Sequence, residues 1–169
     1  HFVREKARHT SVSIHLLESP EEIEFQHDRG PIVEFLKRLG QHVKHPELQG
    51  RSAVEYLHSV GMLSFKKLLL VHLSAARVED IDLLSEYVPH AAWVICHRSN
   101  KYLGIERTNW ETLRHSPLKM LIGTDSLASN TDLSVMREMK AILSEGKYSE
   151  RELMRAATWD AYEFLEIKD

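Results

Sequence analysis

The sequence has little cysteine and no long apolar run. Its single cysteine, Cys96, excludes an internal disulfide and is typical of a protein from the reducing cytoplasm. No apolar stretch approaches the roughly 18 residues of a membrane span, and we expect no signal peptide before the first strand. We therefore expect a cytoplasmic protein.

The sequence also lacks an excess of charge of either sign. Its net charge is −3, and acidic and basic residues are well mixed along the chain. This balance argues against nucleic acid or a membrane surface as the main partner. The chain has 169 residues, of which 43% are hydrophobic, so it is long enough to bury the core of one ordinary domain.

Three short apolar runs each end in a side chain that can take part in chemistry. The first run ends at His15 with Glu18 close behind, the second at His72, and the third at Asp125. A buried parallel strand has this pattern, and its last residue points into the crevice where such folds bind ligands. The three runs therefore predict one shared site.

Helical patterns separate these apolar runs, so that expected strands and expected helices alternate along the chain. Helices are expected over residues 19–40 with a break near Gly30-Pro31, over 52–60 and 77–87, around Leu133 to Leu143, and from Ser149 to about Leu165. A further short apolar run covers residues 91–96, and a loop follows it to about Ser116. Leu133, Met136, Met139 and Leu143 are expected on one apolar helix face. Four strands that alternate with helices predict a parallel sheet.

Two architectures contain strands and helices in this order. An open doubly wound sheet normally has a glycine-rich phosphate loop after its first strand, and none follows Ile14. In an eight-stranded barrel, the catalytic residues come from the ends of several strands. The sequence therefore favours half of a barrel.

Short motifs at the four strand ends resemble a known family. The motifs are Ser13-Ile14-His15-Leu16-Leu17-Glu18, Leu70-Val71-His72, Cys96-His97-Arg98-Ser99-Asn100 and Gly123-Thr124-Asp125-Ser126-Leu127-Ala128-Ser129-Asn130, and Leu153-Met154-Arg155-Ala156-Ala157-Thr158 follows them. Together they resemble the second half of the catalytic barrel of the amidohydrolase superfamily, in its cytosine deaminase-like and S-adenosylhomocysteine deaminase-like branch. The resemblance implies an α/β fold, the (β/α)8 TIM barrel, of which residues 1–169 would form strands 5 to 8 with their helices as a single partial domain.

The resemblance implies that His15 and Asp125 are ligands of one divalent metal ion. A neutral imidazole suits zinc, which is the first candidate, and also ferrous iron. Asp125 would in addition hold the hydrolytic water, whose pKa the metal lowers from about 15.7 toward about 7. The reaction implied is hydrolytic deamination of an aminated heterocycle.

The resemblance assigns roles to four more residues. Glu18 would carry a proton to the ring nitrogen of the substrate and to the leaving amine. His72 would form a hydrogen bond with the attacking water or the developing tetrahedral centre. Ser129 and Asn100 would position the substrate. The catalytic residues implied are thus Glu18, His72 and Asp125.

Each of these residues also has an ordinary structural interpretation. A histidine at the end of an apolar run can be held by hydrogen bonds alone, and Glu18 can act as a cap acid near Ser19. Ser99 and Asn100 can hold the loop after the third strand through bonds to the backbone. The ordered sequence of four motifs favours the catalytic interpretation for His15 and Asp125.

The chain departs from the family's usual sequence at two motifs and lacks a third. His97 stands where the family usually has proline, and Trp159-Asp160-Ala161 where it usually has Asn-Gly-Ala. The family takes two further metal ligands from a His-x-His pair, and the sequence contains no such pair. Two ligands are too few for a catalytic metal, which needs about three from the protein. We therefore expect a fragment of a longer chain, inactive and without metal on its own.

The resemblance also narrows the expected substrate and partners. Residues 1–5 and 99–104 are most similar to deaminases of adenine-type nucleosides, in particular aminofutalosine deaminases. An open half barrel exposes two strand edges and an apolar face, so we expect it to pair with another copy or with the missing half. A stable monomer in light scattering at high concentration would argue against such pairing. The alternative function is a non-catalytic barrel fragment that serves as an assembly or interaction module.

Overall fold

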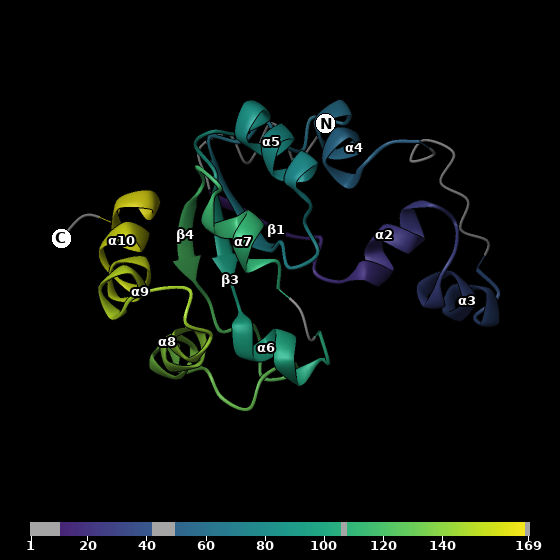
Figure 1. Cartoon of the computed structure of the whole chain (residues 1–169). Helices are drawn as coiled ribbons and strands as arrows, with labels where there is room; N and C mark the ends of the chain where they lie inside the picture. Colours follow the sequence, from purple (N-terminus) through teal and green to yellow (C-terminus); the bar gives the residue numbers. More distant parts are fainter. Residues whose placement is uncertain (1–10, 42–49, 106–107, 168–169) are drawn as a thin grey trace.

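Four parallel strands form a sheet whose order follows the sequence. The computed structural model describes residues 11–41, 50–105 and 108–167 (Figure 1). The strands are β1 (Ser11–Leu16), β2 (Lys67–His72), β3 (Ala92–Ile95) and β4 (Lys119–Ile122). They pair in the order β1-β2-β3-β4, and each pair is parallel. The predicted parallel sheet is confirmed, and β2 ends at His72, where the second apolar run was expected to end.

Helices connect the strands and continue beyond the last one. They are α2 (Pro20–Gln26), α3 (Pro31–Arg38), α4 (Ala53–Ser59), α5 (Val78–Tyr87), α6 (His97–Tyr102), α7 (Trp110–Arg114), α8 (Val135–Ser144), α9 (Glu150–Ala157) and α10 (Trp159–Leu165). Capping boxes begin α4 at Ser52 and α9 at Ser149, and a proline occupies the first turn of α2 and α3. None of the described helices has the length and hydropathy to cross a membrane.

One face of the sheet packs against helices. The row that crosses the four strands on this face is Ile14, Leu70, Trp93 and Met120. Leu70 and Trp93 belong to a core cluster with Val54 of α4, Leu84 of α5, Ile142 of α8 and Leu153 of α9, and Ile14 and Met120 pack against this cluster. Burial of this apolar surface is the main favourable term in folding.

The other face of the sheet carries the neighbouring row. This row is His15, Val71, Val94 and Leu121, and none of its members belongs to the core cluster. Ser11, Ser13 and His15 of β1 are exposed on it. One face of the sheet is therefore covered by its own helices. We call the other the open face, because its β1 edge is exposed, although Val71 and Leu121 on it are buried.

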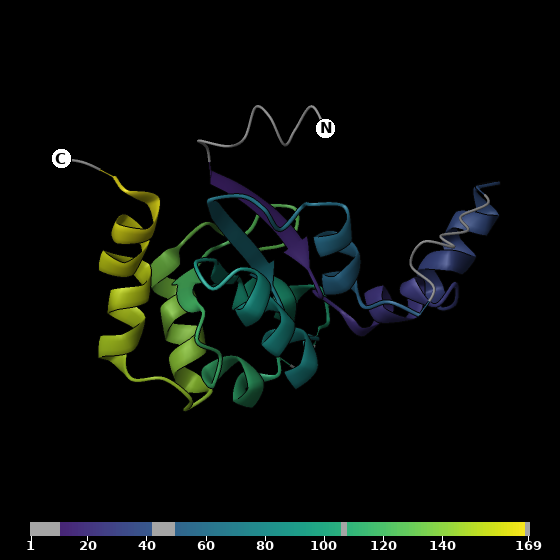
Figure 2. The same cartoon turned by 90° about the horizontal axis from the view of Figure 1, so that it is seen from above.

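Helices α2 and α3 form an arm that extends away from the sheet (Figure 1, Figure 2). The break between them at Gly30 agrees with the sequence, because Gly30 has φ +89 and Pro31 begins the next helix. At the other end of the sheet, α9 and α10 pack beside β4.

Some expectations from the sequence were wrong in detail. The segment expected as a loop to Ser116 contains α6 and α7, which have no apolar period that would reveal them. The third run does not remain a strand up to Asp125, because β4 ends at Ile122. Leu133 lies before α8, and it and Met136 are 55% and 66% exposed, so only Met139 and Leu143 of the expected face pack inward.

Gly123 allows the segment after β4 to pass close to β3. A Cβ atom at this position would lie 2.8 Å from Val94 Cγ1, which is closer than packing allows, and 3.0 Å from Cys96 Sγ, which is an unusually tight contact. We expect Gly123→Ala to lower the free energy of unfolding by about 1–3 kcal/mol, as overpacking does. Urea unfolding of the full-length protein measures this change, and an unchanged midpoint would contradict the packing described here.

Candidate active site

The structure brings the ends of three strands together. Ligand atoms of Glu18, His72 and Asp125 all lie within 4.8 Å of one another. His72 Nε2 is 3.5 Å from Glu18 Oε1, and His15 Nε2 is 4.0 Å from Asp125 Oδ1. The rings of His15 and His72 have centroids 5.2 Å apart. Four of the residues singled out in the sequence thus form one cluster at the carboxyl ends of the strands.

The backbone adopts left-handed conformations where the strands end. Leu17 follows β1 with φ +50, His72 ends β2 with φ +75, and Asp125 follows β4 with φ +58. Residues other than glycine rarely adopt these angles, and such strain collects at functional sites. The left-handed backbone conformations occur at two of the clustered residues, His72 and Asp125, where the chain leaves the sheet.

Two serines hold one oxygen of Asp125. Ser99 Oγ donates to Asp125 Oδ2 at 2.7 Å, and Ser129 Oγ donates to the same oxygen at 2.6 Å. Burial raises the pKa of Asp125, but the hydrogen bonds from Ser129 and Ser99 outweigh it and hold this pKa below its usual value. Asp125 is therefore a carboxylate at neutral pH, with Oδ1 directed to His15.

Asn100 orients the ring of His72, which is fully buried. Asn100 Nδ2 donates to Ser74 Oγ at 2.6 Å, so Asn100 Oδ1, 2.9 Å from His72 Nδ1, accepts the proton of that nitrogen. Burial lowers the pKa of His72, against the opposing effects of Glu18 and Asn100, so the ring is neutral at pH 7. His72 Nε2 is thus an acceptor, and it is buried without a hydrogen-bond partner among the described residues.

Asn100 and Ser129 contact the site residues in this structure. Asn100 is fully buried and bonds to His72 and Ser74, whereas Ser129 bonds to Asp125. That they position the substrate stays a prediction. Sequence reasoning missed the bond from Ser99 to Asp125, because a contact between residues 26 positions apart leaves no local pattern.

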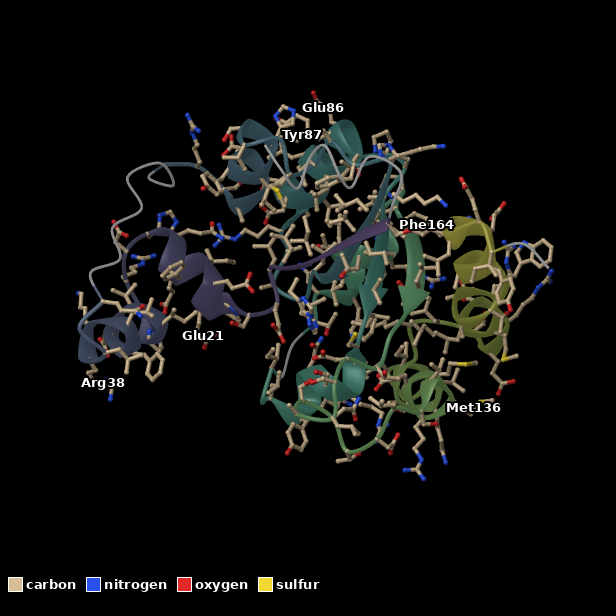
Figure 3. The ribbon with its side chains drawn as sticks, turned by 180° about the vertical axis from the view of Figure 1, so that it is seen from behind. Glu21, Arg38, Glu86, Tyr87, Met136 and Phe164 are labelled. Atoms are coloured by element: carbon tan, nitrogen blue, oxygen red, sulfur yellow. The ribbon has the colours of Figure 1, made fainter. Side chains whose placement is uncertain are left out.

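A cavity opens beside Glu18. It has a volume of about 560 Å³ and is lined by Glu18, Ser19, Pro20, Glu21, Leu103, Gly104 and Ile105. It therefore lies between the loop after β1 and the end of α6, next to the clustered side chains. Figure 3 labels Glu21, which comes from the start of α2 and is one of the residues that line the cavity. Its size is in the range of small-molecule sites.

The donor atoms of His15 and Asp125 fit a divalent metal ion. Imidazole nitrogen and carboxylate oxygen are ordinary zinc ligands, with bonds of about 2.0–2.2 Å. Two such ligands of one tetrahedral ion lie about 3.3–3.5 Å apart. His15 Nε2 and Asp125 Oδ1 are 4.0 Å apart and would move closer together on binding the ion. The ionised state of Asp125 also suits a ligand, because ligands bind metal in their deprotonated form.

Comparison with known proteins defines the class to which this fold and site belong. The Amidohydrolase family matches residues 2–169, nearly the whole chain, and the chain belongs to this family. The resemblance drawn from the strand-end motifs is confirmed.

The more specific similarities are to deaminases. The aminodeoxyfutalosine deaminase of Nitratiruptor sp. is 30% identical over 162 residues, which cover 91% of this chain and 37% of the relative. The 5-methylthioadenosine/S-adenosylhomocysteine deaminase of Teredinibacter turnerae is 31% identical over 139 residues, covering 82% of this chain and 26% of the relative. The crystal structure of Helicobacter pylori aminofutalosine deaminase in complex with methylthio-coformycin superposes with a TM-score of 0.80 at 25% identity, covering 99% of this chain and 41% of that one. The chain thus spans about a third of the length of these relatives.

Proposed function

We propose that this chain is the C-terminal half of a metal-dependent aminohydrolase barrel, which deaminates an adenine-type nucleoside by hydrolysis as part of a longer protein. The observation that carries the proposal is the cluster of Glu18, His72 and Asp125, whose ligand atoms lie within 4.8 Å of one another at the strand ends. Residues 1–169 would form a single partial domain with strands 5 to 8 of the barrel.

The order of the strands supports a barrel over a doubly wound sheet. Sequential parallel strands with their helices on one face are typical of barrels, whereas a doubly wound sheet reverses its order at a switch point. In a barrel the open face, with the row that contains His15 and Val71, would line the interior. The edges of β1 and β4 would then pair with the remaining strands.

His15 and Asp125 would hold the metal ion, with zinc as the first candidate and iron as the second. When bound, the ion lowers the pKa of a water molecule toward about 7, so that a nucleophile exists at neutral pH. Two ligands leave the site incomplete, since catalytic zinc usually has three from the protein. We propose that the others belong to the missing half, and that the chain alone is inactive.

Three side chains would move and hold protons during the reaction. Asp125 accepts a proton from the attacking water, and His72 Nε2, an unprotonated acceptor, orients that water. Glu18, 3.5 Å from His72, delivers protons to the ring nitrogen and to the leaving amine. A carbon–oxygen bond forms as Glu18 gives its proton to the ring nitrogen. The new hydroxyl then loses its proton, which Glu18 passes to the leaving amine, the carbon–nitrogen bond breaks, ammonia leaves and the carbon becomes a carbonyl. The proton held by Asp125 returns to Glu18, so the water supplies both protons. Ser129 would contact the substrate near Asp125. Asn100 would help to position the substrate through its hydrogen bond to His72.

The relatives support an adenine-type substrate. Deaminases of aminodeoxyfutalosine and of 5-methylthioadenosine/S-adenosylhomocysteine match most of this chain. The cavity beside Glu18 would take the part of the nucleoside that lies beyond the reacting ring. We propose a cytoplasmic enzyme that acts on a small molecule, with no nucleic acid or membrane partner. It would assemble with further copies or, as a fragment, with its missing half.

Removal of metal tests the proposed function. A chelator is expected to abolish ammonia release by the full-length protein from adenosine or 5′-methylthioadenosine, because Asp125 and His72 alone cannot produce a nucleophile from water. Addition of zinc or ferrous iron after removal of the chelator is expected to restore it. Ammonia release that continues unchanged in metal-free protein would contradict the proposal.

A further inference from the structure

Glu138, in the first turn of α8, is a fully buried carboxylate outside the clustered site. Its Oε2 accepts a hydrogen bond from the backbone nitrogen of Arg98 at 2.9 Å. Its Oε1 accepts one from Asn130 Nδ2 at 2.8 Å. Burial of a carboxylate is costly unless such donors satisfy it, and here burial raises the pKa of Glu138. Because burial of a carboxylate is unfavourable, the packing of α8 alone does not explain why Glu138 lies here.

The two donors are the neighbours of the two serines that hold Asp125. Arg98 precedes Ser99, and Asn130 follows Ser129. Both serine hydroxyls donate to Asp125 Oδ2, at 2.7 and 2.6 Å. Asn130 also donates to the carbonyl of Thr124, the residue before Asp125, at 2.8 Å. One carboxylate thus joins the segment after β3 to the segment after β4, one residue away from each serine.

A second set of contacts ties the same two segments together on the outside. The Arg98 guanidinium donates to both carboxylate oxygens of Asp132, at 2.8 and 3.0 Å, and to Thr131 Oγ1 at 2.5 Å. This bidentate pair would keep the segments attached if Glu138 were changed. The Arg98 guanidinium also lies 4.0 Å from Glu138 Oε1, so Glu138 takes part in both sets of contacts. Its own hydrogen bonds are the ones next to the two serines.

We propose that Glu138 is a positioning residue for Asp125. Through the Arg98 backbone and the Asn130 amide it fixes Ser99 and Ser129, and these hold Asp125 Oδ2 so that Oδ1 faces His15. A carboxylate is required because both partners are donors, and glutamine offers only one acceptor oxygen. This inference rests on the proposed function, in which Asp125 is a metal ligand and proton acceptor.

The test compares Glu138→Gln with Glu145→Gln in the full-length protein. Glu145 is a control for the loss of an acidic link between the end of α8 and α6. It pairs with His97 at 3.0 Å and Lys101 at 2.7 Å, each two residues from Ser99, but makes no bond to the Arg98 backbone or to Asn130. We expect Glu138→Gln to lower kcat about 10- to 100-fold with KM changed less than about 3-fold, and to speed zinc loss to a chelator by a similar factor. Glu145→Gln is expected to leave kcat and zinc loss unchanged.

A double-mutant cycle separates positioning from a general structural role. In a Ser99→Ala, Ser129→Ala background, Glu138→Gln is expected to cause no further fall in kcat and no faster zinc loss. The serine hydroxyls through which Glu138 acts on Asp125 are already absent in this background. Additive effects, or equal effects of the Glu138 and Glu145 variants, would overturn the inference. If Glu138→Gln does not fold, Asn130→Ala removes one donor alone, and the same cycle with Ser129→Ala applies.

Failure of the proposed function gives a different result. A wild-type protein that binds zinc but releases no ammonia contradicts the deaminase, while zinc loss still reports whether Glu138 positions Asp125. A wild-type deaminase in which Glu138→Gln changes neither kcat nor zinc loss contradicts the positioning role alone.

Discussion

Asp125→Asn in the full-length protein is expected to abolish ammonia release. Asparagine has the size of aspartate, so it can remain beside Ser99 and Ser129, but it has no negative charge to bind a metal ion or to accept a proton from water. Loss of a group that transfers a proton costs about 10²–10⁴-fold in rate, and the loss of a ligand adds to this. We expect a fall in kcat of about 10³-fold or more, measured as ammonia release.

The control for this variant is Asp160→Asn. Asp160 pairs with Arg155 at 2.8 Å in the C-terminal helices and lies in no part of the proposed site. It should retain wild-type turnover, and both variants should unfold near the wild-type urea midpoint. Turnover by Asp125→Asn within about tenfold of wild type would contradict the role of Asp125.

Glu18→Gln has the second large expected effect. Glutamine keeps the shape of the side chain but cannot deliver a proton, so we expect kcat to fall by about 10²–10⁴-fold. The loss should be smaller for a 6-chloropurine nucleoside, because chloride leaves without a proton whereas the amine needs one. The measurement compares the release of ammonia and of chloride by the same variant.

Glu24→Gln is the matched control for Glu18→Gln. Glu24 is an exposed glutamate on α2, outside the residues that line the cavity beside Glu18. It is expected to leave both reactions at wild-type rates. Equal losses of ammonia and chloride release in Glu18→Gln would show that Glu18 does not protonate the leaving group.

Local patterns were sufficient to predict the sheet and the cluster at its strand ends. Apolar runs give the strands, and parallel strands place their carboxyl ends at one edge, so His72 and Asp125 could be expected close together. The break at Gly30 also follows from residue chemistry within a few positions, because the glycine and the proline after it end one helix and begin the next.

Long-range contacts could not be predicted in the same way. The bond from Ser99 to Asp125 spans 26 positions, and that from Arg98 to Glu138 spans 40. Helix α6 has no apolar period, and its first turn is held by Glu138 from a distant helix. Met136 repeats at helical spacing but is 66% exposed, because the apolar side of α8 is set by what packs against it.

The proposal that this chain belongs to a metal-dependent nucleoside deaminase is tested most directly by one measurement on the full-length protein. Bound metal and ammonia release are determined together, with adenosine, 5′-methylthioadenosine and S-adenosylhomocysteine as substrates. We predict about one divalent ion per chain, as catalytic sites of this ligand type hold, and ammonia release from at least one of the three nucleosides. A protein that takes up no metal and releases no ammonia when zinc or iron is supplied would contradict the proposal and favour a non-catalytic interaction module.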